Sequence, residues 1–178
     1  RASMSRCHGM KLTALPPEIG NLTSLQFLGL DTIQLSTLRP EIGKLTNLTT
    51  LNLSGNRLTA LPPEIGNLTS LITLYLWDNK LTALPDEIGK LTNLQTLNLH
   101  GNQLTVLPPA ISKLNKLKDL SLTKNSLNRV PGEIGQLTDL QELGLGSNQL
   151  DSLPAELGQL VNLESLYLWG NKLTIFPP

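Results

Sequence analysis

The sequence predicts an α/β solenoid, a curved array of short coils with a parallel β-sheet on its concave side and short helical or 3₁₀ turns on its convex side. Three observations predict this fold. A pattern of aliphatic residues recurs every 23 residues, and each repeat contains one short alternating stretch followed by one turn that begins with Pro and ends near Gly. Aromatic residues make up only 3% of the chain, so the core has to be aliphatic.

A 23-residue unit accounts for almost the whole chain. The unit that begins at Leu48 reads LTTLNLSGNRLTALPPEIGNLTS, with apolar residues at places 1, 4, 6, 11, 14, 18 and 21. Six complete units extend over residues 25–162, a degenerate partial unit or cap precedes them at residues 1–24, and a truncated unit follows at residues 163–178. Because the last unit stops short of its own helical turn, we expect the natural protein to continue beyond Pro178.

The first half of each unit predicts a short β-strand. Apolar residues at places 4 and 6, such as Leu51 and Leu53, alternate with other residues, so the two sets point to opposite faces of a strand. We expect places 4 and 6 to enter the core and places 3, 5 and 7 to form three rows of side chains across the concave surface.

The second half of the unit, LPPEIGNL, predicts one helical or 3₁₀ turn. Proline suits the first turn of a helix, glutamate there suits the helix dipole, and Gly66 at place 19 is expected to end the turn. A single coil buries about seven aliphatic side chains, worth roughly 1.5–3 kcal/mol each. Ordering its backbone costs roughly 1–2 kcal/mol per residue, so stacking on neighbouring coils decides whether the array folds.

An asparagine at place 9 is expected to connect neighbouring coils. Its side-chain amide lies inside a turn, where it can bond backbone groups of its own coil and of the adjoining one, and such a buried ladder is favourable when every member is satisfied. The ladder is absent from the first two units, where Met10 and Ile33 occupy this place. Its members are Asn56, Asn79, Asn102, Asn125, Asn148 and Asn171.

The combined pattern LxxLxLxxNxLxxLPxxIGxLxx resembles the leucine-rich repeat superfamily over nearly the whole chain. The 23-residue unit with LPxxIG is similar to the class found in Roco GTPases, plant intracellular Ras-group-related repeat proteins and bacterial effectors. It differs from the plant receptor class, whose units carry LxGxIP. The resemblance implies a curved solenoid used for protein recognition, but no particular partner, because a fold does not fix a function.

All Tyr and Trp residues of the chain fall in two matching pentapeptides, YLWDN from Tyr75 and YLWGN from Tyr167. The repeat register places Tyr75 and Trp77 on one concave strand and Tyr167 and Trp169 on another, four strands and about 20 Å further along. Tyr and Trp dominate binding hot spots, so exposed pairs with no core to fill predict a partner site. The alternative explanation is the general preference of strands for aromatic residues.

Other residues on the same surface extend the candidate site. Asn98 and His100 adjoin the first aromatic pair, and Asp78 lies at the edge of its strand. Gly144 and Gly146 are expected to leave bare backbone beside the second pair, where a partner could approach closely.

Asp119 and Glu142 are neighbours in one concave row. An incoming Lys or Arg would relieve the repulsion between the two carboxylates, although ordinary solvated surface is the alternative. An open sheet offers no pocket to shift a pKa, which argues against a catalytic pair. The residues predicted to bind a partner are therefore Tyr75, Trp77, Asp78, Asn98, His100, Asp119, Glu142, Tyr167 and Trp169.

Composition argues against several classes of function. The formal net charge is zero, which disfavours nucleic acid or an anionic membrane surface as partner. The single Cys rules out an intramolecular disulfide and a Cys-based metal site, and favours a reducing compartment. We expect a cytoplasmic protein, or alternatively a secreted bacterial effector, with no cofactor, no metal and no enzyme activity.

The predicted function is a protein–protein interaction module that binds a protein or peptide on its concave sheet. Two alternatives stay open. The array could be the targeting or regulatory region of a larger multidomain enzyme, such as a GTPase, kinase or ubiquitin ligase, or it could be a structural spacer or self-association surface.

Overall fold

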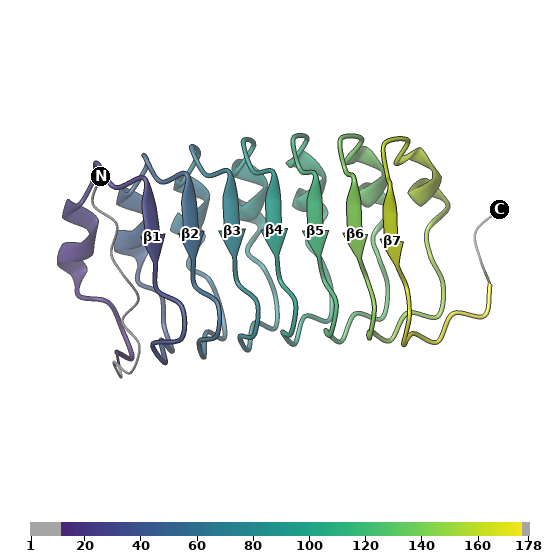
Figure 1. Ribbon diagram of the computed structural model, residues 1–178, viewed down its shortest axis with the longest axis horizontal. Helices are drawn as coiled ribbons and strands as arrows, with labels where there is room; N and C mark the ends of the chain where they lie inside the picture. The colour runs from purple at the N-terminus through teal and green to yellow at the C-terminus, as the bar shows by residue number, and fades with distance from the viewer. Residues whose placement is uncertain (1–11, 176–178) are drawn as a thin grey trace.

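A computed structural model describes residues 12–175 of the chain, and these residues form one elongated array of stacked coils (Figure 1). Seven parallel strands make a single sheet in which the strand order is the chain order. Each strand has three residues at places 3 to 5 of its unit. The strands are β1 (Phe27–Gly29), β2 (Thr50–Asn52), β3 (Thr73–Tyr75), β4 (Thr96–Asn98), β5 (Asp119–Ser121), β6 (Glu142–Gly144) and β7 (Ser165–Tyr167).

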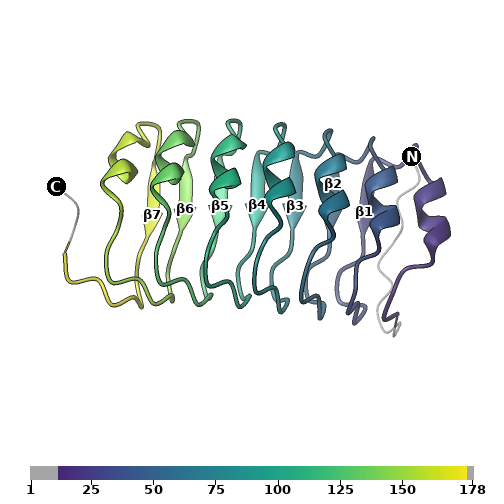
Figure 2. The same ribbon diagram turned by 180° about the vertical axis from the view of Figure 1, so that it is seen from behind.

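Seven 3₁₀ helices of five residues each cover the opposite side of the array (Figure 2). Each begins directly after a residue with an extended backbone, usually Pro, and so the solenoid predicted from the sequence is confirmed, with 3₁₀ turns on its convex side. The helices are η1 (Pro17–Asn21), η2 (Pro40–Lys44), η3 (Pro63–Asn67), η4 (Asp86–Lys90), η5 (Pro109–Lys113), η6 (Gly132–Gln136) and η7 (Ala155–Gln159).

The strands pair without any register shift. Residues 23 positions apart are direct partners throughout, as in Thr50 with Thr73 and Thr73 with Thr96. Each place of the repeat therefore forms a straight row of side chains across the sheet. This register determines which concave residues become neighbours.

The core is a continuous aliphatic layer between the sheet and the 3₁₀ helices. In the unit that contains β3, Leu71, Leu74, Leu76 and Leu81 are all fully buried, and Ile88 in η4 meets them from the convex side. The same places are buried in the units before and after it. Because each coil is too thin to enclose these side chains alone, its neighbours supply the missing walls of the core.

The backbone at place 8 adopts a left-handed conformation in every unit from β1 to β7. Values of φ there lie between 51° and 69°, a region that glycine enters readily and that other residues, above all the β-branched Thr32, enter at a cost. This turn takes the chain from the concave sheet down to the asparagine of place 9. The residues concerned are Thr32, Gly55, Asp78, Gly101, Lys124, Ser147 and Gly170.

The asparagine of place 9 hydrogen-bonds to two coils at once. In Asn102, Nδ2 donates to the carbonyl oxygens of Leu76 and Leu99, each at 3.0 Å. Its Oδ1 accepts a hydrogen bond from the backbone N–H of Leu81, also at 3.0 Å. Leu99 belongs to the same coil, whereas Leu76 and Leu81 belong to the preceding one. Asn79, Asn125, Asn148 and Asn171 make the same set of bonds.

Glycine at place 19 lies inside the 3₁₀ helix and does not end it, so that prediction is wrong. Helix η3 continues through Gly66 to Asn67. The glycine serves the contact between coils, because a Cβ on Gly66 would lie 2.6 Å from the carbonyl oxygen of Glu87 in the next coil. Where Ser112 occupies this place, its hydroxyl donates a hydrogen bond to the carbonyl oxygen of Pro109 at 2.9 Å.

The first 11 residues of the unit predicted at residues 1–24, Met10 among them, lie outside the described residues. The described part of this unit contributes Leu15 and Ile19 to the core, and the backbone N–H of Leu12 donates to the carbonyl oxygen of Ile33 at 3.0 Å. Within residues 12–175, no helix is long and apolar enough to cross a membrane.

The asparagine ladder gives a first test. Replacing Asn102 by Leu leaves the backbone N–H of Leu81 without a partner in the interior, at roughly 1–3 kcal/mol. It also removes one of the two hydrogen bonds to the carbonyl oxygens of Leu76 and Leu99, which keep those from Asn79 and Asn125. We expect Asn102→Leu to lower the melting temperature strongly and Gln103→Leu, at an exposed neighbouring place, to leave it nearly unchanged. Thermal unfolding followed by circular dichroism measures both, and equal melting temperatures would refute a stabilising ladder.

The glycines of place 19 give a second test with an internal control. Gly66→Ala forces a methyl group against the backbone of Glu87, and overpacking of this kind costs about 1–3 kcal/mol. Gly158→Ala makes the same change in η7, where a Cβ would have no atom within 4 Å. We expect Gly66→Ala to destabilise the chain in urea unfolding and Gly158→Ala to be neutral or stabilising by about 0.5–1 kcal/mol. Equal losses from both would contradict close coil contact as the reason for the glycine.

Candidate functional site

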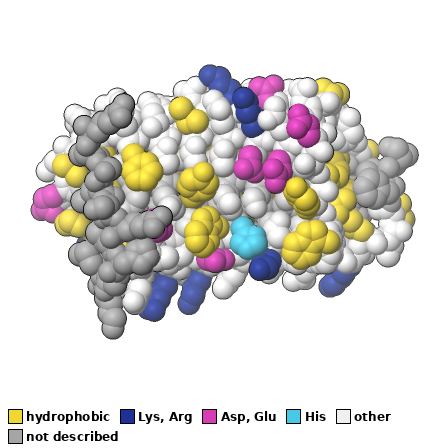
Figure 3. Space-filling view, viewed as in Figure 1, with side chains coloured by type: hydrophobic (Ala, Val, Ile, Leu, Met, Phe, Trp, Pro, Cys, Tyr) yellow, Lys and Arg dark blue, Asp and Glu magenta, His cyan; other side chains and the backbone are white. Residues whose placement is uncertain are grey.

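The exposed side of the sheet is the surface on which the predicted site residues meet. We call it the concave face and define it by places 3, 5 and 7 of the units that carry β1 to β7. Figure 3 views this face, with hydrophobic side chains in two groups and acidic side chains between them. The side chains in these groups come from different coils, and the in-register sheet brings them onto one face.

The first aromatic pair lies at β3. Tyr75 is the last residue of the strand and is half-buried, whereas the Trp77 side chain is 37% exposed. Sheet-like pairing continues beyond the strand, since the carbonyl oxygen of Trp77 accepts from the N–H of Gly55 at 2.8 Å. The neighbouring N–H of Asp78 donates to the carbonyl oxygen of His100, also at 2.8 Å. The backbone under Trp77 is therefore held from both sides.

Ser54, the neighbour of Trp77 in the adjacent coil, departs from the predicted pattern. The alternation places Ser54 on the exposed surface, but its side chain is fully buried and its hydroxyl has no hydrogen-bond partner. The row at place 7 is therefore not uniformly exposed.

Asn98 and His100 adjoin the first aromatic pair from the next coil. Asn98 is the direct strand partner of Tyr75. Its side-chain Oδ1 accepts a hydrogen bond from the backbone N–H of His100 at 3.0 Å, which fixes the orientation of the carboxamide. Both side chains are half-buried. They form a polar border beside the two aromatic rings.

The second aromatic pair lies at β7 and is more exposed. Tyr167 is 44% exposed and Trp169 is 56% exposed. The expectation of bare backbone beside this pair is wrong, because the indole of Trp169 packs directly on Gly146, where a Cβ would lie 2.6 Å from the ring. Gly146 is buried as a result, and so is Gly144, which lies close to the Thr123 hydroxyl. Gly146 therefore provides space for the Trp169 ring, and the two glycines do not leave an open gap.

Phe27 is a concave-face aromatic residue that the sequence analysis did not select. It begins β1, is 44% exposed, and its ring packs beside Gly29 two residues later. Phe27 occupies place 3 of its unit, which the sequence analysis predicted to lie on the concave surface. The signal that could have identified it is an aromatic residue at an outward place followed by a glycine.

Asp78 lies at the edge of this surface. Its backbone is left-handed, with φ of 52°, and its side chain is exposed. The carboxylate lies against Gly101 of the next coil, so closely that the position has no room for a side chain there. Asp78 thus directly follows the first aromatic pair and lies against the next coil.

Asp119 and Glu142 are direct partners in adjacent parallel strands, the first residues of β5 and β6. Burial, and secondly the Glu142 carboxylate, raise the pKa of Asp119 above its ordinary value. Parallel strands lie about 4.8 Å apart, so the two acidic side chains start from adjacent backbones. Figure 3 shows acidic side chains touching on this face.

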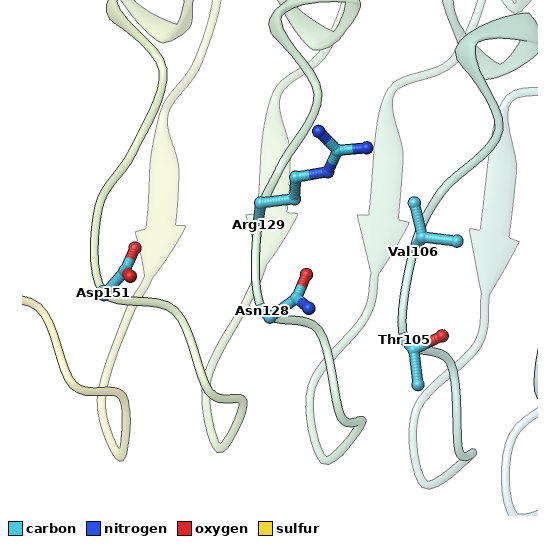
Figure 4. A pocket seen from close by; sticks show the side chains of 5 residues that line it. All are labelled: Thr105, Val106, Asn128, Arg129 and Asp151. Carbon is cyan, nitrogen blue, oxygen red and sulfur yellow. The ribbon is translucent and has the colours of Figure 1, made fainter.

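A separate hollow lies on the side away from the concave face, below the 3₁₀ helices (Figure 4). Side chains from three successive coils line it, with Arg129 between Val106 on one side and Asp151 on the other. Its volume is about 610 Å³, and Thr105 and Asn128 complete the lining. This set has no nucleophile paired with a base, so the hollow offers no catalytic arrangement.

Among residues 12–175, no group of three or more His, Cys, Asp or Glu side chains could hold a metal ion.

A sequence model of the leucine-rich repeat region matches residues 3–82 and 74–175, which together cover most of the chain. The chain belongs to the leucine-rich repeat family. The 23-residue coil is its leucine-rich repeat, and the concave face is the exposed sheet of that repeat array. No curated protein sequence matches the chain.

Solved structures of the same family resemble this leucine-rich repeat chain. A leucine-rich repeat protein of Leptospira interrogans shares 39% identity over 94% of this chain and 54% of its own, with a TM-score of 0.69. An internalin of Listeria monocytogenes, InlF, shares 28% identity over 89% of this chain and 46% of its own, with a TM-score of 0.78.

A plant receptor also matches the array. The leucine-rich repeat ectodomain of the membrane receptor kinase GASSHO1/SCHENGEN3 from Arabidopsis thaliana was solved in complex with CASPARIAN STRIP INTEGRITY FACTOR 2. It shares 34% identity over 90% of this chain and 26% of its own, with a TM-score of 0.71. The present chain thus spans about half or less of the length of these three proteins.

The raised pKa of Asp119 gives a test of stability against pH. A carboxyl group whose pKa is higher in the folded state than in the unfolded state destabilises the fold when it is ionised. We expect Asp119→Asn to raise the melting temperature at pH 7. The gain should shrink as the pH falls through the raised pKa and disappear below the ordinary value of 3.8, where the wild-type carboxyl is protonated in both states.

Melting curves from pH 3 to pH 8 measure this effect, and Asp139→Asn, at an exposed place outside the concave face, is the matched control. A gain for Asp119→Asn that is the same at every pH would show that charge is not its cause.

Proposed function

We propose that this leucine-rich repeat chain is a protein–protein interaction module that binds a polypeptide on its concave face. One observation carries the proposal. Two pairs of aromatic side chains, at β3 and β7, lie on a face whose other residues are mostly small or polar, although the core holds only aliphatic side chains. Trp77, Tyr167 and Trp169 are exposed, and Tyr75 is half-buried. Leucine-rich repeats act generally as protein-binding modules, and this arrangement supports the same use here.

The aromatic side chains are not needed to complete the fold. In the unit of β3, Leu74 and Leu76 are fully buried, whereas Tyr75 and Trp77 alternate with them on the outside. Burying an exposed Trp or Tyr against a partner removes a large apolar area from water and leaves a polar group available for a hydrogen bond. These two properties make such residues frequent anchors of protein interfaces.

The residues around the first pair support it as the centre of the contact. The Asn98 carboxamide is held in one orientation by its bond to the His100 N–H, and little side-chain entropy remains to be lost when a partner binds. The His100 side chain beside it adds a group that can donate or accept a hydrogen bond. In the second pair, Trp169 packs on Gly146 and so presents a similarly supported ring at the other end of the face.

A second candidate function is supported by the comparisons. This chain covers only part of each solved relative, and one of those relatives is the ectodomain of a receptor kinase. In this second candidate function, the array is the targeting part of a larger protein. The concave face is its contact surface in both candidates. The length of the natural reading frame around these residues distinguishes this candidate from a free-standing module.

The test of the proposed function is the double variant Tyr75→Ala, Trp77→Ala. Hot-spot residues cost about 2 kcal/mol or more each when truncated, so we expect captured partners from a native lysate to be lost and the Kd of a purified partner to rise at least 30-fold. Both side chains lie outside the core, so the melting temperature should change little.

Val106→Ala is the matched control, since Val106 is also 37% exposed but lines the hollow on the other side. Light scattering at several concentrations separates loss of partner binding from loss of self-association. If the folded double variant captured the same partners as the wild type, the assignment of the concave face as the binding surface would be wrong.

A further inference from the structure

The concave rows contain acidic residues but no Lys or Arg. The concave rows from β1 to β7 contain the acidic residues Asp31, Asp119 and Glu142 and no Lys or Arg, although the chain as a whole has as many basic as acidic residues. Figure 3 shows basic side chains mainly toward the upper and lower margins of this face. A binding surface with acids and aromatic rings but no cation is complementary to a partner that carries positive charge.

No Lys or Arg shares the row of the acidic pair, although Lys118 precedes Asp119 in the chain. No Lys or Arg occurs between Val130 and Asn171, the part of the sequence that supplies β6 and β7. Among the described residues, no hydrogen bond donor is found for the Asp119 carboxylate, and burial with the repulsion from Glu142 raises its pKa. A Lys ammonium or an Arg guanidinium between the two carboxylates would remove this repulsion and supply donors to both.

The sheet itself limits how a partner can bind. The N–H and C=O groups of β2 to β6 are used in pairing with both neighbouring strands, so a partner cannot add a strand within this face. Recognition therefore depends on side chains. These side chains stand in a fixed order along the array: Tyr75 with Trp77, then His100, then Asp119 and Glu142, then Tyr167 with Trp169.

We propose that the concave face binds an extended basic segment of a polypeptide that runs across the strands. In this arrangement a Lys or Arg lies between Asp119 and Glu142, and a large apolar or aromatic residue lies on each side, against the two aromatic pairs. The inference rests on the proposed function, because it specifies the chemistry of the same partner. An acidic face repels the phosphates of nucleic acids and of anionic lipids, which leaves a cationic polypeptide as the fitting partner.

The spacing of the rows sets the spacing of residues in the segment. From β3 to β7 there are four strand intervals of about 4.8 Å, or roughly 20 Å, and an extended chain advances about 3.3 Å per residue. The two outer anchors should therefore lie about six residues apart. The acidic pair lies two to three intervals from β3, so the basic residue should follow the first anchor by about three or four positions.

The experiment is selection from a displayed library of random 12-residue peptides against four forms of the chain. These are the wild type, Tyr75→Ala with Trp77→Ala, Asp119→Asn with Glu142→Gln, and the matched pair Asp139→Asn with Glu156→Gln. The last pair removes the same charges from exposed places outside the concave rows. We expect wild type and the matched pair to select peptides with a Lys or Arg between two large apolar residues, in either chain direction.

The outcomes separate this inference from the proposed function. The aromatic variant should select no common motif, and the Asp119→Asn, Glu142→Gln variant should keep the outer anchors but lose the preference for Lys or Arg. Wild-type peptides that depend on Tyr75 and Trp77 but show no basic preference would overturn the inference and leave the proposed function standing. A wild type that selects nothing beyond what the aromatic variant selects would overturn both.

A titration then measures the charge contact directly. For the strongest wild-type peptide, replacing its basic residue by Gln should weaken binding about fivefold to tenfold in the wild type at low salt and leave binding to the Asp119→Asn, Glu142→Gln variant unchanged. Added salt should reduce the wild-type effect. Equal losses in both forms would show that the basic residue binds elsewhere and would overturn the inference.

Discussion

The hydrogen bonds of the place 9 asparagine are the interaction on which the rest of the structure depends. Asn102 bonds to Leu99 in its own coil and to Leu76 and Leu81 in the coil before it. Because one side chain satisfies backbone groups of both coils, the coils cannot shift along each other without leaving buried groups unpaired. The strict 23-residue register of the strands follows from this constraint, and with it the straight rows of the concave face.

The register separates stability from recognition. Leucines at places 4 and 6 are committed to the core, while most residues at places 3, 5 and 7 lie outside it, with Ser54, Gly144 and Gly146 as buried exceptions. A pair such as Tyr75 and Trp77 can therefore be present in one coil and absent in the next. The binding properties of such an array depend on the residues that the repeat pattern does not require. The strand spacing determines the distances between these residues.

The sequence was sufficient to predict the period, most of the inner and outer positions and a short helical or 3₁₀ turn after each Pro, because each of these follows from local alternation and from Pro placement. It was insufficient where neighbouring coils touch. The burial of Ser54 and the seat of Trp169 on Gly146 depend on the coil next to them. In the sequence, Gly66 resembles a residue that ends a helix. In the structure, its missing side chain allows the backbone of Glu87 in the following coil to approach closely. The environment of Asp119 likewise arises from the next strand.

Asp119 and Glu142 show that the same scaffold can place two repelling carboxylates side by side on its surface. The folded chain raises the pKa of Asp119, since burial and then Glu142 both oppose the ionisation of its carboxyl group. A repeat array has many outward places, and the row could separate two acids by a neutral residue without disturbing the core. The pair instead stands in adjacent strands between two sets of aromatic rings, in a row that contains no Lys or Arg. A destabilising charge pair of this kind is explained most directly by a cation that the partner supplies, since binding then relieves a repulsion that folding alone leaves in place.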